Sequence, residues 1–273
     1  MRVIPTGDVT PPHKRDIGIK EAKGAIIAFL DDDAYPCKEW LRYAREDFRD
    51  EGVAAVGGPA VTAPSDSPRQ QASGLVYSSV LVSARFTYRY VAGKRRPVED
   101  YPSCNLLVRK DALDKLGGFK TSFWPGEDTK LCLDITRGLH KKIVYDPRVL
   151  VYHHRRPLFK GHLKQIANYA LHRGYFVKKY PATSLKPAYF APSIFLVFLT
   201  AGALWVFFFD QFNVPYASML LAYLTATLAG AYAVSRVDKG LIPLVWQGII
   251  LTHLTYGFFF IKGLSLPRLP EEH

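Results

Sequence analysis

The sequence predicts an α/β domain followed by an interfacial helix and about three transmembrane helices. Three observations support this fold class. Strand-like and helix-like segments alternate over residues 1–150, as in a sheet covered by helices. Residues 188–273 are almost continuously apolar. The formal net charge of +12 lies entirely in residues 1–187, because four basic and four acidic residues cancel in the remainder.

Short apolar runs predict the strands of the α/β domain, which we place at residues 1–156. These runs are AIIAFL, VAAVGGPAV, the first half of SCNLLVRKDALDKLGG, and KIVYDPRVLVYHH with its bend at a proline. KEWLRYAREDF and KLCLDITRGLH have helical spacing, and a further short helix ends at Gly117 and Gly118. The alternation predicts a mainly parallel or mixed sheet, in which ligands bind beyond the carboxyl ends of strands.

Three apolar segments follow, before a tail at residues 262–273. They are AYFAPSIFLVFLTAGALWVFFF (188–209), PYASMLLAYLTATLAGAYAVS (215–235) and LIPLVWQGIILTHLTYGFFFI (241–261). Each approaches the roughly 20 residues that cross a hydrocarbon core, and none contains Lys, Arg, Asp or Glu. The alternative is a bundle of buried helices in a soluble protein. Three such segments with short connections favour the membrane.

The segment between the α/β domain and the first apolar segment, residues 157–187, mixes large apolar side chains with six lysines and arginines. One interpretation is an amphipathic helix that lies in the membrane interface with its lysines toward lipid head groups. The other is an ordinary surface helix of the α/β domain. Its position directly before an apolar segment favours the interfacial interpretation.

Charge and cysteine usage indicate where the protein acts. MRVIPTGDV lacks the apolar core of a signal peptide, so we expect a multi-pass protein of the cell membrane with its basic domain on the cytoplasmic face. The three cysteines form no CxxC pair and fit reduced thiols. We expect the basic surface to contact membrane lipids or phosphorylated substrates, and no nucleic acid. Three crossings would place the tail outside the cell, whereas a re-entrant segment would not.

Three consecutive carboxylates, Asp31, Asp32 and Asp33, follow the first predicted strand. Clustered carboxylates repel one another unless solvent or a cation screens them. Mg²⁺ and Mn²⁺ prefer oxygen ligands, commonly one or two carboxylates together with substrate phosphates. The triplet is therefore a candidate site for such a cation and a diphosphate. The alternative is an acidic loop before a helix, where negative charge is also favourable.

A second pair of carboxylates, Glu127 and Asp128, follows a Pro-Gly turn at the start of a predicted helix. One of them could act as a general base toward a hydroxyl group if it points into a cleft. The alternative is helix capping. Phe123 and Trp124 precede the pair, and they fit either a wall against a sugar face or part of the core.

Two histidines, His153 and His154, end the last predicted strand. A neutral imidazole is a common metal ligand, but a strand directs only one of two successive side chains to a given side. A structural role is the alternative for either residue. Arg155 and Arg156, which come next, fit contacts with phosphate oxygens or with the membrane interface.

The order and spacing of these motifs resemble those of the family 2 glycosyltransferases, which have the nucleotide-diphospho-sugar transferase (GT-A) fold. The resemblance covers roughly residues 3–154. The three blocks that carry it are KRDIGIKEAKGAIIAFLDDDAYP, SCNLLVRKDALDKLGGF and GEDTKLCLDITRGLHKKIVYDPRVLVYHH. The basic–aromatic segment and the apolar segments resemble bacterial members that build extracellular polysaccharide on a lipid carrier.

The resemblance implies a role for each candidate residue. Asp31 and Asp33 match the family's D-x-D, which holds Mg²⁺ or Mn²⁺ and the donor diphosphate, and Asp32 is auxiliary there. Asp128 matches the catalytic base, with Glu127 and Trp124 on the acceptor side, and His153 falls where some relatives have a further metal contact. The implied reaction is an inverting transfer of sugar from a nucleotide-sugar donor to a lipid-linked or polysaccharide acceptor at the cytoplasmic membrane face.

The sequence also departs from the family pattern. Lys130 and Asp134 stand where members often have an acidic residue and an arginine. The QxxRW motif of processive synthases is missing, and QIANYALHRGY occupies the comparable region, which favours addition of one sugar. About two βα units of the nucleoside-binding part are expected before MRVIPTGD, so we expect a fragment or a truncated domain. The alternative function is a catalytically inactive membrane subunit with a role in assembly.

Overall fold

The computed structural model describes residues 2–272, which form two compact units. The first unit contains the chain up to Val61, then Tyr88–His153, and again from Arg268 onward. The second unit contains Thr62–Thr87 and His154–Pro267. Each unit is described by itself.

The first unit is built on two sheets. The larger has the strand order β1 (Ile26–Leu30), β6 (Asn105–Arg109), β3 (Val53–Gly57), β7 (Lys142–Tyr145) and β5 (Arg96–Val98). Strands β3 and β7 run parallel, whereas the other neighbours are antiparallel, which confirms the mixed sheet that the sequence predicts. The smaller sheet has the order β2 (Ala34–Pro36), β8 (Val151–His153) and β4 (Ala60–Thr62).

Helices cover these sheets. They are α1 (Pro11–Glu21), α2 (Trp40–Asp47), α5 (Lys110–Leu116) and α6 (Glu127–Leu133), with a π turn η2 (Asp134–Gly138). A 3₁₀ turn η1 (Ala84–Arg89) begins in the chain segment of the second unit and ends in that of the first. Helix α5 ends at Gly117, whose φ of 74° is a left-handed conformation that glycine adopts without steric cost. Every residue of β3 is buried, and Trp40 and Phe48 of the α2 region pack against that strand.

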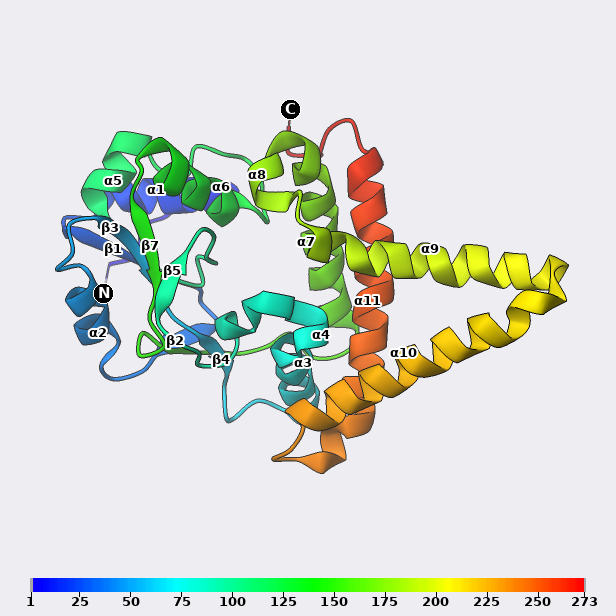
Figure 1. Ribbon diagram of the computed structural model, residues 1–273. Coiled ribbons are helices and arrows are strands. Elements are labelled where there is room, and N and C mark those ends of the chain that lie inside the picture. The colour runs from blue at the N-terminus through cyan, green and yellow to red at the C-terminus, as the bar shows by residue number, and fades with distance from the viewer. Residues whose placement is uncertain (1, 273) are drawn as a thin grey trace. The chain divides into compact units, whose positions relative to one another are not determined.

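The second unit is helical. Its helices are α3 (Pro68–Ser78), α4 (Val80–Ser83), α7 (Lys160–Lys179), α8 (Pro181–Ser184), α9 (Pro187–Phe208), α10 (Asn213–Val234) and α11 (Ile242–Ser265), with short turns η3 (Asp210–Phe212) and η4 (Lys239–Leu241). Three of them, α9, α10 and α11, are long and apolar enough to cross a membrane. Helices α9 and α10 form a hairpin that extends away from α7 and α11 (Figure 1).

The division into units does not follow the chain from end to end. The sequence predicts one α/β domain over residues 1–156, but residues 62–87 within that range fold with the helical unit. The reason is the apolar face of α3: Ala72 and Val76 pack into a core with Val245 and Ile249 of α11. A contact between segments so far apart in the chain leaves no local signal in the sequence.

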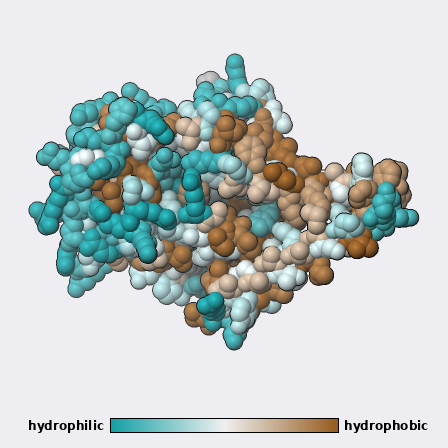
Figure 2. Space-filling view, in the orientation of Figure 1, coloured by the Kyte–Doolittle hydropathy of each residue, from teal (hydrophilic) through white to brown (hydrophobic). Residues whose placement is uncertain are grey.

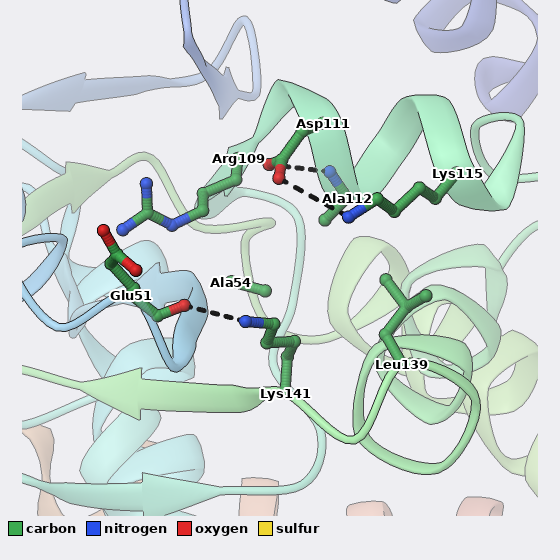
Figure 3. A pocket seen from close by; sticks show the side chains of 8 residues that line it. All are labelled: Glu51, Ala54, Arg109, Asp111, Ala112, Lys115, Leu139 and Lys141. Atoms are coloured by element: carbon green, nitrogen blue, oxygen red, sulfur yellow. Dashed lines mark hydrogen bonds and ion pairs between the residues drawn. The ribbon is translucent and has the colours of Figure 1, made fainter.

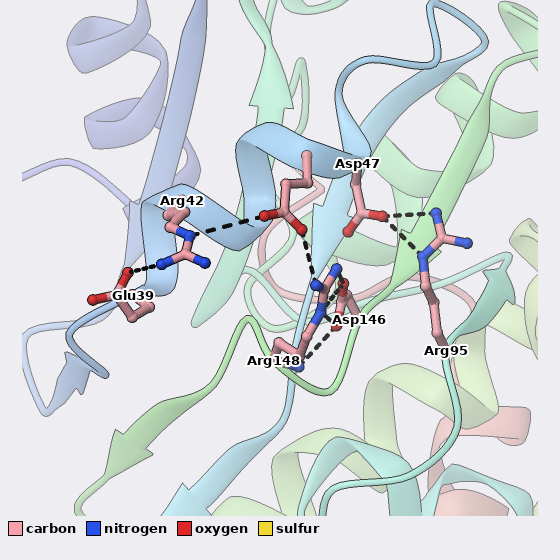
Figure 4. A network of polar contacts seen from close by, with 7 residues as sticks. Glu39, Arg42, Asp47, Arg95, Asp146 and Arg148 are labelled. Atoms are coloured by element: carbon pink, nitrogen blue, oxygen red, sulfur yellow. Dashed lines mark hydrogen bonds and ion pairs between the residues drawn. The ribbon is translucent and has the colours of Figure 1, made fainter.

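A cluster of ion pairs fixes the loop that leads from β7 to β8 (Figure 4). The fully buried Asp146 accepts hydrogen bonds from the backbone and the guanidinium of Arg148, which also pairs with Glu46. Nearby, Arg95 donates two hydrogen bonds to the buried Asp47. Burial acts to raise the pKa of Asp146, but the bonds from Arg148 outweigh it and hold that pKa below its ordinary value.

Candidate active site

Asp31, Asp33 and His153 come together at the ends of two strands. The two aspartates directly follow β1, and His153 is the last residue of β8. The antiparallel register of β2 and β8 pairs Ala34 with His153 and so places the neighbouring Asp33 beside the imidazole. One ligand atom from each of the three residues lies within 4.8 Å of the others, and His153 Nε2 is 2.9 Å from Asp33 Oδ1.

This donor set fits a divalent cation. Two carboxylates and an imidazole can each supply one ligand atom from a partly buried side chain, and the remaining positions stay open to water or a phosphate. Asp32, between the two aspartates, is exposed and lies outside the group. His154 is also outside it: its Nδ1 lies 2.6 Å from Asp66 Oδ1, so of the two histidines only His153 joins the group.

Arg15 of α1 connects the aspartate cluster with the second pair of carboxylates. Its guanidinium donates a hydrogen bond of 3.1 Å to Asp31 Oδ1 and a second one to Glu127 Oε1. Desolvation works against the charge on Arg15, but the nearby carboxylates of Glu127 and Asp31 outweigh it and raise its pKa. The guanidinium of Arg15 therefore links Asp31, after the end of β1, to Glu127 at the start of α6.

Glu127 and Asp128 form the first turn of α6, where the positive end of the helix favours carboxylates. The two oxygens of Asp128 accept hydrogen bonds from the backbone N–H groups of Thr129 and Ser103, at 2.7 and 3.3 Å. Glu127 is buried, and its Oε2 has no hydrogen-bond partner within residues 2–272. A buried carboxylate oxygen with spare capacity is suited to accept a hydrogen bond from a ligand hydroxyl.

Asp128 has the electrostatics of a general base. Withdrawal from water, together with the negative charges of Glu127 and Asp100, raises the pKa of Asp128 to about 7, although Arg15 acts in the opposite direction. Asp128 as a whole residue is partly exposed. A pKa near neutrality lets a carboxylate take up a proton during reaction and release it afterwards.

The two aromatic residues before this pair have different surroundings. Phe123 is 4% exposed and belongs to the core, which leaves it unable to line a sugar site. Trp124 is 53% exposed, so its ring is available to stack on a ligand. Of the two aromatic candidates, only Trp124 has a ring exposed enough to contact a ligand.

Lys130 of α6 and Asp134, the first residue of η2, are the two departures from the family pattern, and they form an ion pair of 2.5 Å. The pair has the i to i+4 spacing at which helix side chains meet. The helix thus has a cation and an anion in contact, with the cation nearer its start.

A pocket of about 320 Å³ lies elsewhere in the first unit (Figure 3). None of the candidate site residues lines it. Its basic side chains contact the protein itself: Lys141 donates to the Glu51 carbonyl at 3.0 Å, and Lys115 pairs with Asp111 at 3.9 Å. Arg109 donates to the carbonyls of Val53 and Phe48. We therefore assign no ligand to this pocket.

Sequence reasoning did not single out two residues that shape the site. Arg15 is one of many basic residues in the chain, and only its contacts with Asp31 and Glu127 distinguish it. Asp100 affects the pKa of Asp128 from a loop far away in sequence, where it also accepts a hydrogen bond from Thr129 Oγ1. Arg15 lies in a block that carries the family resemblance, so its position held a signal, whereas Asp100 had none.

The first part of the chain is similar to known proteins. Residues 10–117 match the family "Glycosyl transferase family 2". The succinoglycan biosynthesis protein ExoM of Rhizobium meliloti (strain 1021) is 34% identical over 146 residues, which are 50% of this chain and 42% of that protein. A pre-mycofactocin glycosyltransferase of Mycobacterium tuberculosis (strain CDC 1551 / Oshkosh) is 27% identical over 160 residues, 58% of this chain and 33% of that protein.

A third relative comes from an archaeon. The glycosyltransferase AglE of Haloferax volcanii is 29% identical over 115 residues, or 42% of this chain and 34% of that protein. The chain thus covers less than half the length of each of these relatives. The matched family segment contains Arg15 and the aspartate triplet, whereas Asp128 and His153 lie beyond it.

Proposed function

We propose that the protein transfers a sugar from a nucleotide-sugar donor to a glycan acceptor, because residues 10–117 match the family "Glycosyl transferase family 2". The proposed reaction is metal-dependent, proceeds by a single displacement and inverts the anomeric carbon. The proposed acceptor is a lipid-linked glycan or a polysaccharide, as the name of the succinoglycan relative and the apolar helices suggest.

The observation that carries this proposal is the contact network around Arg15. Its guanidinium contacts Asp31, a candidate cation ligand, and Glu127, the neighbour of the candidate base. A sugar transferase needs a place for the diphosphate and a base for the acceptor within reach of the same sugar. One residue in contact with both sets of carboxylates supports a single site that serves both purposes.

Asp128 is proposed to remove the proton from the acceptor hydroxyl as that oxygen attacks the anomeric carbon. The hydrogen bonds from the backbone of Thr129 and Ser103 hold its carboxylate in place. The free Oε2 of Glu127 would accept a hydrogen bond from a second hydroxyl of the acceptor, and the exposed ring of Trp124 would pack against its sugar face.

Asp31, Asp33 and His153 would hold the divalent cation, with Asp32 near the donor diphosphate. When bound, Mg²⁺ or Mn²⁺ would neutralise the negative charge that develops on the nucleoside diphosphate as it departs. The protein residues fix where that charge develops, because the register of β2 and β8 positions Asp33 and His153 together.

The proposed location is the cytoplasmic face of the cell membrane. The three apolar helices indicate contact with lipid, and the lysine- and arginine-rich part of the chain precedes them. An excess of basic residues beside membrane spans is typical of the cytoplasmic side. Nucleotide sugars are charged and polar, so this face gives the site direct access to donor from the aqueous phase.

The test is donor turnover by the full-length protein with a panel of UDP-, GDP- and dTDP-sugars, measured as released nucleoside diphosphate. We expect turnover that requires added Mn²⁺ or Mg²⁺ and stops with a chelator. Asp33→Asn should raise the cation concentration needed for half-maximal rate, whereas the control Asp111→Asn, on an exposed helix position, should not.

Each alternative predicts a different result in this assay. Turnover that survives complete chelation would disprove metal dependence. No turnover with any donor, in protein that is folded and inserted, would favour the alternative function, an inactive membrane subunit with a role in assembly.

A further inference from the structure

We propose that α9 and α10 are the two membrane-crossing helices of the second unit, and that α11 lies in the membrane interface on the side where α9 begins and α10 ends. The surface involved is the α9–α10 hairpin, and its partner is the hydrocarbon core of a lipid bilayer. The proposal concerns topology and does not depend on the proposed catalytic activity.

The hairpin has the length and surface of a double crossing. Each of its helices has 22 residues, which extend about 33 Å and match a hydrocarbon core of about 30 Å. Over the most apolar 18 residues of α9 and of α10, only 6% and 11% of the residues are buried. Large apolar side chains point outward along both helices, and Figure 2 shows brown surface over the hairpin with teal at its far end.

The turn of the hairpin is suited to the far interface. Asp210, Gln211 and Asn213 give it polar groups, and Trp205, Phe209 and Phe212 surround it with aromatic rings. Aromatic residues gather at the level of the lipid head groups in membrane proteins.

Basic residues gather at the other end of the hairpin. The turn has no Lys or Arg, whereas the segments that flank the hairpin carry Lys178, Lys179 and Lys186 before α9, and Arg236 and Lys239 after α10. This asymmetry places the turn outside the cell and the flanks in the cytoplasm.

Helix α11 runs across the base of this hairpin and not alongside it (Figure 1). Trp246 near its start donates a hydrogen bond to Thr227 of α10. Eleven residues later, the Gly257 carbonyl accepts a hydrogen bond from Ser193 in α9. A helix that passes from one leg to the other cannot be parallel to both, so when the legs cross the bilayer, α11 lies near the plane of its surface.

Helix α7 provides a second argument against a crossing by α11. The two helices run in the same direction in close contact, from His162 beside Thr252 to Gly174 beside Phe260. Lys160, Lys164 and Asn168 are exposed on α7 at intervals of four residues. If α11 crossed the bilayer, these polar side chains would enter the hydrocarbon beside it, which is strongly unfavourable.

The chain after α11 provides a third argument. From Arg268 onward it folds with the first unit: Leu269 is 2% exposed, and Ser122 Oγ donates a hydrogen bond of 2.7 Å to the Glu271 carbonyl. The chain leaves that unit after His153 and returns to it at Arg268. Departure from and return to one face of the membrane require an even number of crossings between these residues, and three candidate helices make an odd number.

Single cysteines test this topology in the full-length protein expressed in bacteria. In a Cys37→Ser, Cys104→Ser background, with the fully buried Cys132 retained, a cysteine replaces Gln211, Lys239 or Arg268. A membrane-impermeant maleimide is applied to spheroplasts and, separately, to inside-out vesicles. We expect Gln211→Cys to react in spheroplasts, and Lys239→Cys and Arg268→Cys to react only in inside-out vesicles.

Other patterns of labelling would overturn the proposal. Reaction of Arg268→Cys in spheroplasts would mean that α11 crosses as a third span. Failure of Gln211→Cys to react there would mean that the hairpin does not cross. A measurement on the unsubstituted protein guards against misfolded variants: trypsin, which cleaves after Arg268, should remove the epitope of an antibody against residues 269–272 in inside-out vesicles and leave it intact in spheroplasts.

Discussion

Two clusters of carboxylates in the first unit differ in how well their charge is neutralised. Around Arg148, every carboxylate has an arginine partner, and the pKa of the buried Asp146 lies below its ordinary value. Burial does raise the pKa of Asp47 in this cluster, and its Oδ2 has no hydrogen-bond partner within residues 2–272. Around Arg15, Asp128 has no ion pair within residues 2–272, and its pKa rises to about 7. From this difference we expect the Arg15 cluster to bind a ligand and the Arg148 cluster to stabilise the fold, because strongly perturbed carboxylates are enriched at functional sites.

The largest expected effect is loss of the proposed base. Asp128→Asn should lower kcat by about 1,000-fold, since a positioned base contributes roughly 10²–10⁴-fold and an amide cannot accept the proton. The same change should not destabilise the fold at pH 8. A carboxylate with a raised pKa destabilises the folded state once it is ionised, and this cost grows from about pH 4 to pH 7 and is complete above that. Steady-state turnover and a thermal melt measure the two quantities.

The control for this variant is Asp146→Asn in the neutralised cluster. It removes a partner of Arg148 and should lower the melting temperature while leaving the proton transfer itself intact. If Asp128→Asn retained more than about a tenth of the wild-type kcat, the assignment of the base would be wrong.

The next effect is on stability alone. Arg148→Ala leaves the fully buried carboxylate of Asp146 without its guanidinium partner and should cost about 3 kcal/mol. Arg42→Ala, in the same cluster, removes a guanidinium that is 66% exposed and should cost less than about 1 kcal/mol. Thermal unfolding in detergent compares the two variants. Equal costs would show that the cluster in Figure 4 does not stabilise the first unit through Asp146.

The sequence predicts the candidate site only in part. The family resemblance brings Asp31, Asp33 and His153 into one predicted site, but the pairing of β2 with β8, which places Asp33 beside His153, has no local signal in the sequence. Nothing in the sequence indicates that Arg148 pairs with Glu46. Nothing in it indicates that Asp100 raises the pKa of Asp128. Side-chain partners depend on which loops meet after folding, and neither periodicity nor composition encodes that.

The same limit explains the fold. The sequence predicts most of the strands, the glycine end of α5 and the apolar helices, because each rests on residues next to one another in the chain. It does not predict the short strands β2 and β5. It does not predict that residues 62–87 fold with the helical unit, or that α11 runs beside α7. These depend on helix faces, such as that of Gly174 and Gly263, where an added Cβ would collide with the backbone of the neighbouring helix.

The smallest expected effect concerns Arg15, the cation between the two sets of carboxylates in the candidate site. Because the pKa of Asp128 is about 7, kcat/KM should rise about tenfold per pH unit below 7 and level off above it. The positive charge of Arg15 acts to lower the pKa of Asp128. Arg15→Gln should therefore move the rise of activity to higher pH, which the pH profile of kcat/KM measures.

Arg15→Lys separates the charge of this residue from its hydrogen bonds. A lysine keeps the positive charge but cannot reproduce the planar fork that contacts Asp31 and Glu127 together. If Arg15 acts through its charge, the lysine variant restores the wild-type midpoint of the pH profile. If it acts only as a structural link, both variants lose activity with the midpoint unchanged, and the contrast in charge between the two clusters would then have no bearing on the base.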